Sequence, residues 1–136
     1  MSKLIIPKHI FDEMISHCEA GLPNEACGIL AGKGNEASEI YTMSNNENSS
    51  VSYLMDPAEQ FKAIKAMREK KLDMLGIFHS HPSSPACPSQ KDVDLAFYED
   101  AVYVIVSLVE ERPAVKAFSI VKGGIREIEL VVKKSD

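Results

Sequence analysis

The apolar residues at the start of the chain follow first a helical and then a strand-like spacing. Ile10, Met14 and Cys18 stand four residues apart, which places them on one face of a helix. Pro7 suits the first turn of that helix because it has no N–H to leave unpaired, and Gly21 is a typical stop. The elements predicted here are a short strand over 3–6, a helix from residue 7 up to Gly21, and paired strands over 26–31 and 39–43.

A second helix is predicted to begin at Asp56-Pro57-Ala58-Glu59, after a polar loop over 44–50 and a further short strand over 51–55. Aspartate can cap the helix, proline fits its first turn, and Glu59 can reach back to the N–H of the cap. We expect this helix to end near residue 71. Its predicted apolar face consists of Phe61, Ile64, Met67 and Leu72.

The second half of the chain is mostly β-type in pattern. An apolar run over 74–78 leads directly into His79-Ser80-His81-Pro82, and the apolar, β-branched run over 102–109 is typical of a central strand. The remaining predicted elements are a short helix over 89–97 with Val93, Ala96 and Phe97 facing inwards, and two strands over 115–121 and 125–132 joined by a hairpin. This order of helices and strands predicts an α/β or α+β sandwich around one sheet.

Composition narrows the class of protein. The 136 residues, 45% of them hydrophobic and 26% charged, are ordinary for one globular domain. The formal charge of −5 and the shortness of the lysine-rich stretches argue against nucleic-acid binding. No apolar run reaches membrane-spanning length. The three cysteines lack the spacing of a disulfide framework or of a four-thiolate zinc site, so we expect reduced thiols and a cytoplasmic protein.

Two histidines stand where the apolar strand over 74–78 turns polar. His79 and His81 point to one side of that strand and Ser80 to the other. Two such imidazoles can reach one metal ion, although a pair of surface histidines would have the same pattern. Asp92 offers a third ligand, because a helix start capped by Ser89 keeps the carboxylate ionised, but capping alone also explains both residues. Two histidines and one carboxylate would leave a fourth position open, as in catalytic zinc sites.

The spacing of these residues resembles the JAMM motif of the MPN-domain metalloproteases. His79-Ser80-His81-Pro82, six residues, Ser89, two residues and Asp92 meet every fixed position of that motif. The segment over 23–30 is similar to the one that carries the upstream glutamate of the family, here Glu25. The resemblance covers essentially the whole chain and implies one JAMM/MPN domain over 1–136. The fold it implies is a cytidine-deaminase-like α/β/α sandwich around a mixed β-sheet.

The resemblance also implies a role for each of these residues. His79, His81 and Asp92 would hold one catalytic zinc ion with water in the fourth position. Glu25 would be the general base that takes a proton from the water and delivers it to the leaving amine. Ser89 would donate a hydrogen bond to the oxyanion. The implied activity is that of a zinc metallopeptidase that hydrolyses a peptide or isopeptide bond.

Three other functions fit the sequence less well. A zinc nucleotide deaminase would need a glutamate where His81 stands and a Pro-Cys-x-x-Cys sequence downstream. A phosphoesterase built on a His-x-His pair would need further ligands, and only His9 and His17 remain. A non-catalytic MPN scaffold typically lacks one or more ligands. All are present here, so the alternative that stays open is a scaffold or protein-interaction domain with an intact zinc site.

The resemblance further implies a protein tail as substrate. Members of the family act after the C-terminal Gly-Gly of ubiquitin-like proteins, and this short chain resembles the small stand-alone prokaryotic members, some of which process sulfur-carrier proteins. We therefore expect hydrolysis of an adduct, for example a cysteine, or of a terminal extension after the Gly-Gly of a carrier. Cys87, in the loop over 83–88 between the ligands, is expected to be partly exposed near the metal.

Overall fold

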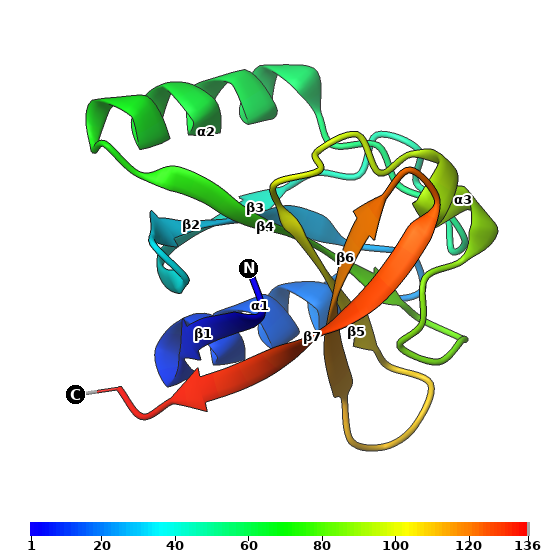
Figure 1. The fold of residues 1–136 in the computed structure, drawn as a ribbon. Helices are drawn as coiled ribbons and strands as arrows, with labels where there is room; N and C mark the ends of the chain where they lie inside the picture. Colours follow the sequence, from blue (N-terminus) through cyan, green and yellow to red (C-terminus); the bar gives the residue numbers. More distant parts are fainter. Residues whose placement is uncertain (136) are drawn as a thin grey trace.

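A computed structural model describes residues 1–135, and over these residues seven strands form one sheet accompanied by three helices (Figure 1). In chain order the elements are β1 (Lys3–Pro7), α1 (Lys8–Ala20), β2 (Cys27–Lys33), β3 (Glu36–Met43), α2 (Pro57–Glu69), β4 (Asp73–His81), α3 (Gln90–Asp94), β5 (Val102–Ser107), β6 (Ala114–Val121) and β7 (Gly124–Lys133). None of the helices in the described part of the chain is long and apolar enough to cross a membrane.

The strands follow the order β1-β3-β2-β4-β5-β6-β7, and the sheet closes on itself. β1 runs parallel to β7, β4 runs parallel to β5, and the β2–β3, β2–β4, β5–β6 and β6–β7 pairs are antiparallel. The sheet is therefore mixed, as predicted. Its closure depends on one residue pair between β1 and β3, Ile5 with Glu36, a contact for which the sequence holds no signal.

The two long helices cover opposite faces of the sheet (Figure 1). α1 buries Ile10, Met14 and Cys18 against one face, together with the apolar residues of β1 and the alternate positions of β5. α2 buries Ala63 and Met67 against the other face, where Ile77 and Ile105 lie. This arrangement confirms the predicted α/β/α architecture. It also places β4 in the middle of the molecule, with its last seven residues all buried between β2 and β5.

The segment over 51–55 is a loop and not the predicted strand. Its pairing is limited to one isolated bridge, Asn45 with Met55. The side chain of Asn45 takes the place of a partner strand, because its Oδ1 accepts a hydrogen bond from the N–H of Leu54 and its Nδ2 donates one to the carbonyl of Ser52, both at 3.0 Å. The loop is thereby fixed without a β-ladder.

Two predicted apolar contacts are also wrong. The side chain of Phe61 on α2 is 70% exposed, and Ala63 occupies the buried position instead. The predicted helix over 89–97 is only the five-residue α3. Beyond Leu95 the chain turns away, since the N–H of Tyr98 donates to the hydroxyl of Tyr103, and Phe97 is left 75% exposed.

The strand predicted over 102–109 is β5, which ends two residues early, at Ser107.

Candidate metal centre

The two histidines of the motif lie at the buried end of β4. His79 is 1% and His81 3% exposed, and both side chains lie on the sheet face that carries Ile77, because side chains alternate along a strand. The loop after Pro82 is held close to the sheet: the hydroxyl of Ser107 donates to the carbonyl of Ser84 at 2.6 Å. This loop returns the chain so that α3 begins beside the strand end.

Asp92 reaches the histidines from the first turn of α3. Ser89 and Asp92 form a capping box, in which the N–H of Asp92 donates to Ser89 Oγ at 3.1 Å and the N–H of Ser89 donates to Asp92 Oδ2 at 2.9 Å. The capping explanation and the ligand explanation of the sequence are therefore compatible. One oxygen of the carboxylate caps the helix, and both point towards the imidazoles.

The donor atoms of these three residues meet in one place. His79 Nε2 lies 3.2 Å from His81 Nε2 and 3.1 Å from Asp92 Oδ1, while His81 Nε2 lies 2.9 Å from Asp92 Oδ2. Ligands at about 2.0 Å from a tetrahedral zinc ion are about 3.3 Å apart. The spacing of this trio therefore suits a small tetrahedral cation, and the donor set of two imidazoles and one carboxylate suits zinc.

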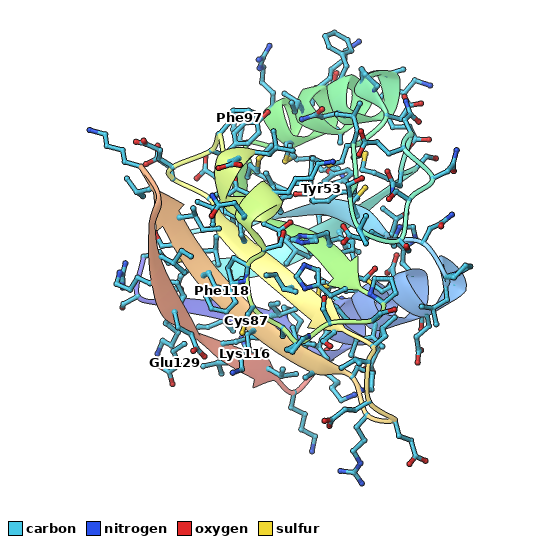
Figure 2. All side chains as sticks on the ribbon, turned by 90° about the vertical axis from the view of Figure 1, so that its right-hand side faces the viewer. Tyr53, Cys87, Phe97, Lys116, Phe118 and Glu129 are labelled. Carbon is cyan, nitrogen blue, oxygen red and sulfur yellow. The ribbon has the colours of Figure 1, made fainter. Side chains whose placement is uncertain are left out.

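The two rings are held by different means. His81 Nδ1 lies 2.9 Å from the carbonyl of Pro85, an acceptor that fixes the proton on Nδ1 and leaves Nε2 free to bind a metal. His79 Nδ1 is buried and has no hydrogen-bond partner among the described residues. Its ring is instead stacked on that of Tyr53, with centroids 4.6 Å apart and an interplanar angle of 23°. The side chain of Tyr53 is labelled in Figure 2.

Tyr53 is a residue that the sequence analysis missed, and its contact gives a testable prediction. Replacing Tyr53 by leucine removes the stacked ring that orients His79, so we expect a tenfold to hundredfold weaker zinc affinity, the usual cost of losing support behind a metal ligand. Tyr53→Phe keeps the ring and serves as the matched control, with an affinity close to that of the wild type. Competition with a chromogenic chelator measures both. Equal affinities for Tyr53→Leu and the wild type would show that the stacking has no such role.

The charges of the trio suit metal binding. Burial alone would raise the pKa of Asp92, but hydrogen bonds from both imidazoles and from the N–H of Ser89 hold that pKa well below its usual range. Burial lowers the pKa of His79 more than Asp92 raises it. Burial also acts to lower the pKa of His81, but hydrogen bonds to Asp92 and to the carbonyl of Pro85 raise it overall. The site thus offers an ionised carboxylate, and in His79 a ring that is neutral as a metal ligand must be.

The segment before β2 brings Glu25 to the same place. Cys27 pairs with His79 across the β2–β4 ladder, and the antiparallel register continues so that Glu25 stands opposite His81 on the same face. Ser80, which points to the other face, fixes this register. Its Oγ accepts from the N–H of Ala26 at 2.8 Å, and its own N–H donates to the carbonyl of Ala26 at 3.0 Å.

Glu25 has a buried carboxylate oxygen without a hydrogen-bond partner in the described part of the chain. It is 5% exposed, and its Oε1 has no hydrogen bond among the described residues. Burial raises its pKa to about 7, with a further contribution from the charge of Asp92 and an opposing one from His81. A carboxyl group whose pKa lies near neutrality is suited to accept and return a proton.

Asn45 is a second residue that the sequence analysis missed. Its Nδ2 donates to the carbonyl of Glu25 at 2.9 Å, and the N–H of Glu25 donates to the carbonyl of Ser49 at 2.8 Å. The loop over 44–55 therefore holds the backbone of Glu25 as well as Tyr53. An asparagine in a polar loop has no distinctive sequence pattern, so its role could only be found in three dimensions.

Of the other candidate residues, Ser89 contacts the trio through the capping box with Asp92, and the remaining ones make contacts elsewhere. Ser89 is exposed, and its Oγ accepts the capping bond, which leaves its hydroxyl proton available. Cys87, labelled in Figure 2, is exposed. Its N–H donates to the carbonyl of Pro85 at 2.8 Å. Cys27 is buried, which raises the pKa of its thiol to about 12. His17 contacts the carbonyls of Cys27 and Met43, and His9 the hydroxyl of Ser135.

Comparison with known proteins places the chain in a family. Residues 7–121 match the model of the prokaryotic homologs of the JAB domain. The chain belongs to this family. Over 127 residues this prokaryotic JAB-domain protein is 37% identical to the CysO-cysteine peptidase of Mycobacterium tuberculosis, covering 91% of this chain and 87% of the relative. Over 133 residues it is 34% identical to a desampylase of Pyrococcus furiosus, covering 97% of this chain and 92% of the relative.

A solved structure has the same fold. The solution structure of a Desulfitobacterium hafniense protein superposes on this prokaryotic JAB-domain chain with a TM-score of 0.88 at 41% identity, covering 97% of this chain and 94% of the other. The family that the motif spacing resembles is therefore the one to which the chain belongs. The relatives named above are a peptidase and a desampylase, both of them hydrolytic enzymes.

Proposed function

We propose that this prokaryotic JAB-domain protein is a zinc-dependent peptidase that hydrolyses the amide bond after the C-terminal Gly-Gly of a ubiquitin-like or sulfur-carrier protein. Residues 1–136 would form one catalytic domain that works in the cytoplasm with its cysteines reduced. The observation that carries the proposal is the meeting of His79, His81 and Asp92 next to the buried, unpartnered carboxylate of Glu25.

Each residue then has a chemical task. A bound zinc ion supplies a Lewis acid that polarises the scissile carbonyl and makes a water molecule more acidic. Glu25 takes one proton from the attacking water as the new C–O bond forms, and returns it to the amine nitrogen as the C–N bond breaks. Ser89 donates a hydrogen bond from its hydroxyl group to the negatively charged oxygen that develops on the carbonyl carbon.

The burial of Glu25 favours an enzyme over a scaffold with an intact zinc site. A buried carboxylate without a hydrogen bond destabilises the fold, and such groups persist mainly where they have a function. A scaffold needs the zinc ligands at most, and replacing Glu25 by an apolar residue would stabilise it. The names of the two relatives, a CysO-cysteine peptidase and a desampylase, support a carrier-protein tail as the substrate.

A cleavage panel tests this function. Zinc-loaded protein is incubated with carriers whose Gly-Gly is joined to cysteine, to a peptide extension, or to a lysine side chain, and an unrelated peptide is included. We expect cleavage after Gly-Gly in at least one carrier, and loss of that cleavage after chelation. Cleavage of the unrelated peptide alone would overturn the substrate class. Tightly bound zinc with no cleavage of any substrate would support the scaffold.

Ser89 can be tested separately from its role as a helix cap. Ser89→Ala should lower kcat by about a hundredfold, because one hydrogen bond to the oxyanion is lost. Ser89→Asp restores a side chain that caps well, yet it cannot donate a proton and should stay at least equally inactive. Thermal unfolding monitors the cap while kcat monitors catalysis. Recovery of kcat in Ser89→Asp would mean that Ser89 acts only by positioning Asp92.

A further inference from the structure

One lysine stands beside the candidate metal centre without a role in the motif. Lys91 precedes Asp92 on α3, and the two residues line the same narrow cavity of about 10 Å³ together with Ser52, Tyr53 and Leu95. Lys91 is the one cation among these lining residues. Its Nζ lies 3.7 Å from Glu47 Oε1, on the loop over 44–55 that also carries Tyr53. The pair therefore spans the gap between α3 and this loop.

The ammonium group of Lys91 is held near the centre but is not committed to Glu47. A separation of 3.7 Å is longer than a hydrogen bond between an ammonium and a carboxylate. The pair of Lys70 and Glu39 makes a useful comparison: it has nearly the same exposure, 53% and 39% against 52% and 39%, but its atoms are hydrogen-bonded at 3.1 Å. Lys91 thus keeps its donors free for a ligand.

Glu47 is fixed relative to the proposed base. Its N–H donates to Asn45 Oδ1 at 3.0 Å, and the Nδ2 of the same asparagine donates to the carbonyl of Glu25. Lys91 directly precedes the proposed ligand Asp92 and lines the same narrow cavity as that aspartate and Tyr53. Its side chain therefore lies beside the candidate metal centre.

The charges around this region discriminate between leaving groups. Glu25, Glu47 and Asp92 are three carboxylates, and a bound zinc ion would offset the charge of its ligand Asp92 and act on the scissile carbonyl. The ammonium of Lys91 is then the side-chain cation of this cavity that can attract a carboxylate on the leaving group. An amino acid released from a Gly-Gly tail has its carboxylate within about 4 Å of the amine nitrogen, two bonds away. The side-chain amine of a protein lysine has no such carboxylate nearby.

We propose that Lys91 binds the α-carboxylate of a single amino acid joined to the Gly-Gly tail, and thereby makes the enzyme selective for amino-acid adducts over isopeptides with protein lysines. This inference rests on the proposed function and names the leaving group of the same site. Glu47 holds the ammonium in place in the absence of substrate and yields it to the incoming carboxylate.

The test compares two synthetic tail peptides ending in Gly-Gly-Cys, one with a free carboxylate and one with a carboxamide. Both carry the same thiol, so their difference isolates the carboxylate. We expect Lys91→Met to lower kcat/KM for the free acid by about tenfold, the effect of one charge-assisted hydrogen bond, and to change that for the amide by less than about twofold. Lys91→Arg should still prefer the free-acid peptide over the carboxamide peptide. Raised salt should reduce this preference in the wild type.

Binding provides a readout that does not depend on turnover. In zinc-loaded protein with Glu25→Gln, fluorescence anisotropy should show that adding Lys91→Met weakens binding of the acid peptide and leaves that of the amide unchanged. Lys70→Met is the matched control, since it removes a lysine of nearly equal exposure at the C-terminal end of α2. It should leave the binding of both peptides unchanged. Glu47→Gln should strengthen binding of the acid, because it removes the competing carboxylate.

The outcomes separate this inference from the proposed function. Lys91→Met could lower kcat/KM equally for the acid and the amide peptides while the wild type cleaves both. In that case Lys91 does not bind the carboxylate of the substrate, and the peptidase function stands. If the wild type prefers a Gly-Gly–lysine isopeptide over the acid, the selectivity is the reverse of that proposed. If the zinc-loaded wild type cleaves none of the peptides and none of the carriers of the panel, the proposed peptidase function is wrong. The proposal for Lys91, which rests on that function, is then wrong as well.

Discussion

Replacing Glu25 by glutamine is expected to lower kcat on a Gly-Gly-Cys tail by about a hundredfold to ten-thousandfold, the range for loss of a general acid–base group. Glutamine has the same shape but cannot take up the proton that leaves the water, nor return it to the amine. Zinc content should stay unchanged, because the ligand atoms belong to His79, His81 and Asp92. Metal analysis and single-turnover kinetics on the same preparation measure the two effects separately.

The same substitution should stabilise the zinc-free protein above neutral pH. The pKa of Glu25 is raised by burial from 4.5 to about 7, so the folded state binds this proton more tightly than the unfolded state. Stability is therefore lost as the pH rises from about 4.5 to about 7 and stays low above that. We expect Glu25→Gln to add on the order of 3 kcal/mol to the free energy of unfolding at pH 8, and little at pH 4.

A matched control and a contradicting result can be defined for both effects. Glu19 is exposed on α1, so Glu19→Gln should leave kcat as in the wild type and should not reproduce the gain in stability that Glu25→Gln gives at pH 8. Chemical denaturation at the two pH values, on protein stripped of metal, measures the second effect. Activity of Glu25→Gln within tenfold of the wild type would remove Glu25 from the proposed mechanism, whatever its stability.

The apolar pattern of the sequence was sufficient for most of the secondary structure, because α1 buries one helical face while β4 and β5 are continuous buried runs. It failed where burial is decided by distant parts of the chain. Phe61 has the spacing of a core residue, yet α2 turns Ala63 and Met67 to the sheet and leaves Phe61 in solvent. The pairing of β1 with β7 joins residues from the two ends of the chain, and no local pattern encodes such a contact.

The site shows the same division between local and distant information. His79, His81, Ser89 and Asp92 are close in sequence, and strand alternation together with helix capping brings them together in the way their spacing predicts. Glu25 could be placed through the resemblance of its segment to the family. Tyr53, Asn45 and Lys91 act on the site from a loop and a helix whose contacts depend on the complete fold, so their roles become visible only in the structure.

Replacing Asp92 by asparagine is expected to abolish zinc retention. Because the metal is lost, kcat on a Gly-Gly-Cys tail should fall by at least about a thousandfold. A neutral carboxamide is a much weaker zinc ligand than a carboxylate, and two imidazoles alone do not complete a zinc site. The amide oxygen of asparagine can still accept the N–H of Ser89, so α3 should keep its cap. The expected loss therefore concerns the metal and not the helix.

Thermal unfolding with and without zinc separates these effects. At zinc concentrations about a thousandfold above its dissociation constant, the metal should add about 4 kcal/mol to the stability of the wild type, and this increment should vanish in Asp92→Asn. Asp94 lies on the same helix, is exposed and only accepts a hydrogen bond from Gln90, so Asp94→Asn should keep both zinc and activity. If Asp92→Asn bound zinc as tightly as Asp94→Asn, the carboxylate of Asp92 would be a helix cap alone, and the metal would need a ligand outside the trio.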